Sequence, residues 1–177
     1  NFQIGNKVLL NFKAKNENKM GYFTAELIKP ISPFFFDDKK RSICILAAST
    51  ILKVLLPERQ INSKIFHSFE KMVNQMNFDN WIYLYIIWEI SLIKELGFDF
   101  NLHEKKYLSK NDNHNIEING RSLKIPKLLL YDKITDLKNY DITEALIFSK
   151  SLLMENFIIP NHLKLPVSRN VLERYFS

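Results

Sequence analysis

The sequence predicts an α+β protein in which a short β region precedes a mostly helical one. Apolar residues alternate with polar ones over the first thirty positions, as in half-buried strands. Later segments carry apolar residues at the three- and four-residue spacing of helices. Apolar residues make up 46% and aromatic residues 13% of the 177 positions, which excludes disorder as the main state.

The β region predicts a hairpin. Val8, Leu10 and Phe12 alternate along a first strand, residues 22–28 form a second, and a polar turn joins them. Two strands alone are marginally stable in water, so we expect a larger β-domain whose earlier strands precede Asn1, which is not a Met. We place this truncated domain at residues 1–29 and a helical domain at residues 30–177.

The helical domain is predicted from apolar spacing and from helix-terminus signals. Asp79 is expected to cap the third helix, and Asp141 with Glu144 is expected to form a capping box at the fourth. Residues 98–140 form an irregular insertion with short strands at 116–118 and 122–125. The expected helices cover residues 39–56, 63–76, 79–96, 141–159 and 167–176.

Catalytic and cofactor chemistry is not indicated. The four glycines are isolated, so no phosphate-binding loop exists. The single cysteine, Cys44, excludes a disulfide framework and is expected in the core. His67 is expected at the surface, and His103 and His114 are too widely spaced for a zinc site. We expect no cofactor, no metal and no enzyme activity.

Glu89 is the one charge in an otherwise apolar helix face. It either pairs with an Arg or Lys, or caps a neighbouring helix end, or acts as a catalytic acid. The structural interpretation is favoured because no second carboxylate lies nearby in the sequence.

The net charge of +6 and the pI near 9.3 favour an acidic partner, although 20 Lys against 5 Arg is also typical of AT-rich codon usage. Basic residues gather on the hairpin, at the start of the first helix and near the C-terminus. The alternative for each is solvated surface. The predicted DNA-binding residues are Lys7, Lys13, Lys15, Lys19, Lys39, Lys40, Arg41, Arg169 and Arg174.

Five segments occur in an order that resembles a known family. They are GNKVLLNFKAK, ILKVLLPERQ, IIWEISLIKELGFDF, IPKLLL and ENFIIPNHLKLPVSRNVLERYF. Together they resemble the bacterial recombination mediator RecO, and Leu-Pro-Glu-Arg and Trp-Glu look like its alphaproteobacterial branch. The resemblance implies that residues 1–29 are the last strands of an N-terminal OB-fold barrel. Lys105 stands where relatives with a zinc module place a Cys, so no metal is carried over.

The resemblance also implies partners. The family binds single- and double-stranded DNA, anneals strands, loads RecA together with RecR, and docks on the acidic tail of single-stranded DNA-binding protein. Ile86 and Ile87 stand where relatives have an Arg, so for tail docking we expect an apolar groove at the third helix with Arg59, Trp88 and Lys94. No membrane span is visible, and a cytoplasmic, nucleoid-associated protein is expected.

The sequence therefore predicts a non-enzymatic DNA repair mediator that holds phosphates without reading bases. The alternatives are a helical protein-interaction adaptor without DNA binding, and a small hydrolase that uses Glu89. Phe34, Phe35 and Phe36 could stack on bases, but a core or interdomain plug is favoured.

Overall fold

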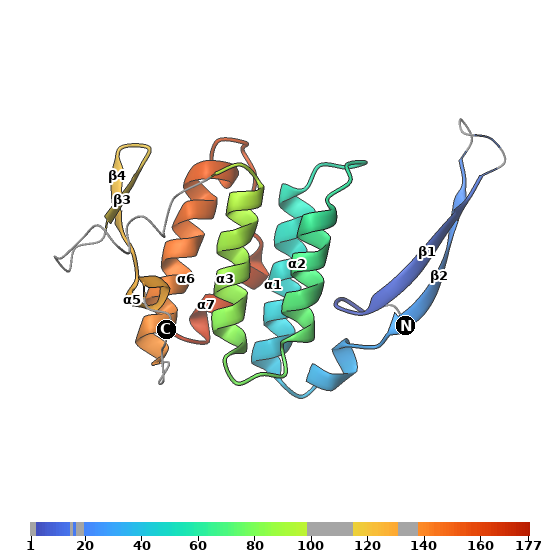
Figure 1. The fold of residues 1–177 in the computed structure, drawn as a ribbon, viewed down its shortest axis with the longest axis horizontal. Coiled ribbons are helices and arrows are strands. Elements are labelled where there is room, and N and C mark those ends of the chain that lie inside the picture. The colour runs from blue at the N-terminus through green and yellow to red at the C-terminus, as the bar shows by residue number, and fades with distance from the viewer. Residues whose placement is uncertain (1–2, 15, 17–19, 99–114, 131–137) are drawn as a thin grey trace.

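The computed structural model describes residues 3–14, 16, 20–98, 115–130 and 138–177, and Figure 1 shows the fold. The predicted α+β class is confirmed, with small antiparallel strand pairs and a predominance of helix. The elements are β1 (Lys7–Lys13), β2 (Tyr22–Lys29), the 3-10 helix η1 (Ser32–Phe35), α1 (Lys39–Leu55), α2 (Ser63–Asn74), α3 (Trp81–Glu95), β3 (Asn115–Ile118), β4 (Arg121–Lys124), α5 (Lys127–Leu130), α6 (Asn139–Leu153), the π-helix η2 (Met154–Ile158) and α7 (Val167–Arg174).

Helices α1, α2, α3 and α6 stand side by side, with α7 behind them (Figure 1). α2 packs on one side of α3 and α6 on the other. A helix enclosed in this way is apolar nearly all round, and most residues of α3 from Trp81 to Ile93 are buried, although Ile87 and Ser91 are exposed. Neighbouring helices therefore cover most of the apolar surface on which the tail-docking groove was expected.

α7 runs antiparallel to α1. The Thr50 and Ser168 hydroxyls lie 2.7 Å apart near the start of α7, and the Lys40 ammonium lies 4.9 Å from the centre of the Phe176 ring just beyond its end. The start of α1 and the end of α7 therefore lie at the same end of the bundle.

The helix ends follow the predictions only in part. Asp38 caps α1 by accepting a hydrogen bond from the Arg41 amide at 3.0 Å, and Pro57 follows the end of that helix. α3 begins after Asn80 rather than after Asp79, and α6 begins at Asn139, before Asp141. The capping-box prediction is therefore wrong, and Asp141 lies inside the first turn, where a negative charge favours the helix dipole.

The predicted strands near residues 116–118 and 122–125 are confirmed as β3 and β4. A two-residue turn of Asn119 and Gly120 joins them, and both residues have positive φ angles, 49° and 77°. Such turns match the right-handed twist of paired strands. Ile116 and Ile118 face the core, so the hairpin packs against the helical domain.

The β1–β2 hairpin lies at the opposite end of the molecule from β3–β4 (Figure 1). It is antiparallel, with Lys13 opposite Tyr22, and large apolar side chains on it are exposed. Its base is held by an ion pair between Lys7 and Glu70 and by a 2.8 Å hydrogen bond from Lys29 to Asn74. Among the described residues, no helix is both long and apolar enough to cross a membrane.

Candidate nucleic-acid interface

Among its described residues, the hairpin carries two exposed cations, Lys13 and Lys29, and Lys29 donates to Asn74 at the base. Lys13 is exposed at the end of β1 next to the turn. Lys7 is half-buried at the base, where it donates to the carboxylate of Glu70. This hydrogen bond is the main cause that lowers the pKa of Glu70. Lys15 and Lys19 lie outside the described residues.

The start of α1 presents two further cations. Lys39 and Lys40 are exposed. Arg41 instead turns back into the protein: its Nε donates to the Met76 carbonyl at 2.6 Å, and its guanidinium pairs with Asp38. Its guanidinium carbon also lies 5.3 Å from the centre of the Trp81 ring. Arg41 therefore ties α1 to the α2–α3 turn, and Lys39 and Lys40 are the cations of this group that face solvent.

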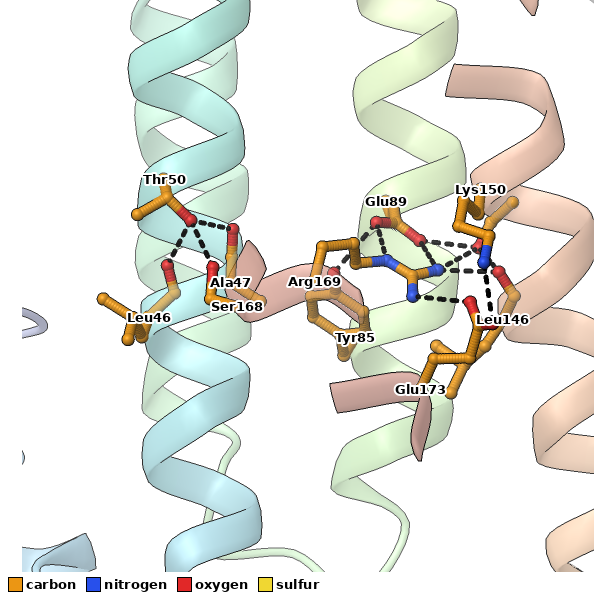
Figure 2. Close-up of polar contacts among 11 residues, drawn as sticks. Leu46, Ala47, Thr50, Tyr85, Glu89, Leu146, Lys150, Ser168, Arg169 and Glu173 are labelled. Carbon is orange, nitrogen blue, oxygen red and sulfur yellow. Dashed lines mark hydrogen bonds and ion pairs between the residues drawn. The ribbon is translucent and has the colours of Figure 1, made fainter. Parts of the chain in front are cut away.

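Arg169 is the main correction to the predicted interface. Its side chain is fully buried, and its guanidinium forms two parallel hydrogen bonds with Glu89, at 2.7 and 2.9 Å (Figure 2). It also donates to the Leu146 carbonyl at 2.7 Å. A phosphate cannot reach a group enclosed in this way, so the prediction that Arg169 binds DNA is wrong. Arg174, one and a half turns later, is exposed.

The structural interpretation of Glu89 is confirmed. Its carboxylate accepts from the Tyr85 hydroxyl at 2.9 Å and from Ser149 at 2.6 Å, besides Arg169 (Figure 2). Burial and the nearby Glu89 charge both raise the pKa of Tyr85, so its hydroxyl stays protonated and donates. Glu89 is fully buried and bonded by three residues, which gives it a structural role and leaves it no exposure to a substrate.

Neighbouring groups keep the Arg169 guanidinium protonated. Burial works against that charge, but the adjoining Glu89 carboxylate outweighs it and raises the pKa of Arg169 overall. Glu173 lies 3.5 Å away and receives a 2.7 Å bond from Lys150. The sequence did carry a signal: Arg169 lies three residues before Leu172, on the buried face of the last helix.

The remaining titratable residues take structural or surface positions. Cys44 is fully buried, which raises the pKa of its thiol and confirms its place in the core. His67 is exposed at the surface, as predicted. His103 and His114 lie outside the described residues, so the prediction of no zinc site stays a prediction.

The three predicted partner-binding residues differ in how exposed their side chains are. Trp88 is buried between Phe69 and Tyr85, with ring centres 5.9 and 5.8 Å away. Arg59 is exposed in the turn after α1, with a φ of 59°, and Lys94 is exposed in the last turn of α3. Trp88 therefore cannot present its face to a partner in this structure.

An apolar cavity lies close to Arg59 instead of on α3. It has a volume of about 420 Å³ and opens between the end of α1 and the start of α2. Leu52, Leu56, Ile61, Ile65 and Phe69 are among its lining residues.

The match to a protein family covers the first three α-helices of the chain. Residues 37–106 match the family described as recombination protein O C terminal. The chain is 30% identical over 113 residues to a DNA repair protein RecO of Ehrlichia chaffeensis, covering 63% of this chain and 46% of the relative. A RecO of a Wolbachia from Drosophila simulans is 32% identical over 103 residues, covering 57% and 43%.

A third relative agrees. The RecO of Caulobacter vibrioides strain NA1000 is 30% identical over 101 residues, covering 56% of this chain and 42% of its own length. The chain thus spans less than half the length of these curated relatives. No solved structure matches. The predicted resemblance is confirmed: this chain is related to the DNA repair protein RecO, with residues 37–106 matching the family's C-terminal segment.

Proposed function

We propose that this chain is part of a DNA repair and recombination mediator that binds single- and double-stranded DNA through phosphate contacts. The observation that carries the proposal is the similarity of residues 37–106 to the C-terminal segment of recombination protein O. Annealing of complementary strands and RecA loading together with RecR belong to the same proposal, as does a cytoplasmic, nucleoid-associated location. The relatives named above are DNA repair proteins, which supports the general role.

The proposed contacts are electrostatic. Lys13, Lys39, Lys40 and Arg174 are exposed and belong to a chain of net charge +6. Lysines that neutralise phosphates release counterions and leave the base edges uncovered. Two complementary strands held in this way repel one another less and keep their bases available for pairing, which is the physical requirement of annealing.

The proposed domain organisation assigns the hairpin to a larger barrel. We propose that residues 1–29 contribute the last strands of an OB-fold and that residues 30–177 form the helical domain. The exposed apolar side chains of β1 and β2, among them Leu10, Phe12 and Phe23, support this assignment because further strands would cover them.

Salt titration tests the DNA contacts. We expect binding to weaken steeply as salt rises, with a slope on logarithmic axes that tracks the number of neutralised phosphates. Lys39→Ala/Lys40→Ala should lower affinity for all sequences alike and reduce this slope. Lys53→Ala is the matched control, because Lys53 is an exposed lysine at the other end of α1. Salt-insensitive binding, or a strong preference for one sequence, would contradict the proposal.

The alternative is a helical adaptor without direct DNA binding. It would leave single-stranded DNA unbound even at low salt while the protein still associates with RecR. The same titration, performed with a RecR pull-down in parallel, separates the two functions.

Tail docking is the second part of the proposal. The single-stranded DNA-binding protein tail is acidic and ends in an apolar residue with a free carboxylate, so its site needs an apolar slot and a cation at the rim. The 420 Å³ cavity supplies the slot, and Arg59 immediately precedes two of its lining residues, Gln60 and Ile61. We therefore propose the groove at the α1–α2 junction rather than on the covered face of α3. Lys94 remains a further cation in the proposed set.

A tail peptide titrated against wild type and Arg59→Ala decides this part. We expect weaker binding by the variant, because the terminal carboxylate loses its cation. Equal affinity for both proteins would discard Arg59, and no binding to either would discard the groove.

A further inference from the structure

A second cavity lies next to the three consecutive phenylalanines. It has a volume of about 210 Å³ and lies between η1, the start of α1 and the segment before β1. Its lining combines an aromatic ring, aliphatic groups and polar side chains: Phe36, Ile45, Gln3, Ser32 and Ser42 belong to it. The polar groups are already ordered, since the Ser32 hydroxyl bonds to the Gln3 side-chain oxygen at 2.7 Å.

Of the three phenylalanines in and just after η1, one is buried and two are exposed. Phe35 is 5% exposed and enters the core, whereas Phe34 is 72% and Phe36 is 76% exposed. Pro33 fixes the backbone at the start of this turn. A core plug therefore describes Phe35 alone. Of the two exposed rings, Phe36 also lines the cavity, and an exposed ring beside an apolar hollow favours contact with a flat, apolar partner.

Two cations follow these rings along the chain. Lys39 and Lys40 come three and four residues after Phe36 and are exposed, although the Lys40 ammonium also lies 4.9 Å from the centre of the Phe176 ring. Two nearby acidic residues would repel a bound anion, but to different extents. Asp38 is neutralised by its ion pair with Arg41, whereas Asp37 is exposed and subtracts one charge from the two lysines. The local excess is therefore positive.

The backbone at the start of α1 is not the anion site. The carboxylate of Asp38 already accepts the Arg41 amide and thereby occupies the amino end of the helix. A phosphate at this position must therefore be bound by the lysine side chains, while the neighbouring rings and cavity remain open to the attached base.

We propose that Phe36 and its cavity take an unpaired base of single-stranded DNA, with Lys39 and Lys40 on the flanking phosphates. This inference rests on the proposed DNA-binding function and adds a strand preference to it. Every base has a π-face, so stacking on Phe36 tolerates any sequence. The bases of a duplex are paired and stacked on each other, so they cannot enter the cavity.

Anisotropy titrations with oligo(dT) and with a duplex of equal length test the inference. We expect Phe36→Ala to weaken binding of oligo(dT) by roughly five-fold or more, the lower end of base-stacking effects. Duplex affinity and the salt slope should not change. Phe36→Trp should retain binding of oligo(dT), because it keeps an aromatic face. Lys39→Ala/Lys40→Ala should weaken binding of both substrates.

Tyr140→Ala is the matched control. Tyr140 is an aromatic residue 68% exposed at the start of α6, but it donates to Glu144 and does not line the cavity beside Phe36. Its removal should leave binding of oligo(dT) unchanged. Thermal unfolding of each variant checks that the fold is kept.

Two outcomes would overturn the inference and one would overturn its basis. If Phe36→Ala binds oligo(dT) as wild type does, the ring does not stack on a base. If it weakens binding of oligo(dT) and duplex equally, the site has no strand preference. If the wild-type protein binds neither substrate at low salt, the proposed DNA-binding function itself fails, whatever Phe36 does.

Discussion

Arg169 and Glu89 illustrate how a buried charge is tolerated. Moving either ion out of water costs several kcal/mol, and their two short hydrogen bonds offset that cost only while both partners are present. The remaining carboxylate capacity is filled by Tyr85 and Ser149. The pair therefore fixes the position of α7 against α3 rather than adding large net stability.

Removing one partner should be severe. We expect Arg169→Met to lower the free energy of unfolding by about 3–5 kcal/mol, because Glu89 is left buried and unpaired. Urea denaturation followed by circular dichroism measures the change.

The double variant Glu89→Leu/Arg169→Met is the informative control. It removes both charges, so it should recover most of the lost stability. Lys150→Met breaks the partly exposed pair with Glu173 and should cost about 1 kcal/mol or less. A double variant as unstable as Arg169→Met would show that the packing of these side chains, and not their charge, decides the effect.

Of the Glu89–Arg169 ion pair, the sequence alone predicts the structural role of Glu89 but not its partner. Glu89 is recognisable because one carboxylate interrupts an apolar helix. The spacing of Arg169 from Leu172 indicates burial, but its partner Glu89 lies 80 positions earlier, so no local pattern identifies the pair. Arg41 combines both cases, since its partner Asp38 is three positions earlier whereas its Met76 acceptor is 35 positions away.

Among the elements, the β3–β4 hairpin depends on its turn. Asn119 and Gly120 both adopt left-handed backbone angles, which Asn tolerates and Gly adopts without strain. A Cβ at Gly120 would meet no atom within 4 Å. Any cost of adding one is therefore a backbone cost alone.

We expect Gly120→Ala to lower the free energy of unfolding by about 1 kcal/mol through this backbone strain. Chemical denaturation measures it. Gly120→Asn serves as the control and should change stability by less, because asparagine tolerates the left-handed backbone better than alanine does. An unchanged midpoint for Gly120→Ala would mean that the turn relaxes to another type.

Element positions were largely predictable, but the starts of α3 and α6 each differ by two residues from the prediction. Apolar spacing locates α1, α2 and α3 to within a few residues, because burial of one face follows from it. Asp141 misled because a carboxylate stabilises both the cap and the first turn of a helix, whereas Asp79 lies one residue before the cap of α3, Asn80. Their charge therefore marks the region of a helix start without marking its residue.

The molecule as a whole joins an exposed hairpin to a packed helical bundle through few contacts. Lys7 with Glu70 and Lys29 with Asn74 hold the base, and Asn6 accepts from the Ile31 amide at 2.7 Å. The sequence could not predict this junction, since each contact joins segments that are distant along the chain.

Acid should loosen the hairpin before the bundle unfolds. The hydrogen bond from Lys7 lowers the pKa of Glu70, so the contact is fully present above the ordinary glutamate pKa and is lost as pH falls through the lowered value. Limited proteolysis across the acid range should show cleavage at the hairpin rising towards low pH. Glu70→Gln should show that cleavage already at neutral pH. A hairpin equally protected in both proteins would show that Glu70 does not hold it.

The distance along the chain between Glu89 and Arg169 also sets an order of events during synthesis. The ribosome makes α3 first and adds Arg169 only 80 residues later. At about 5–20 residues per second, that interval lasts roughly 4–16 s. Throughout it the nascent α3 carries an acid without its cation, so closing the bundle around Glu89 is unfavourable. The bundle acquires its compensated interior only after α7 has emerged from the exit tunnel.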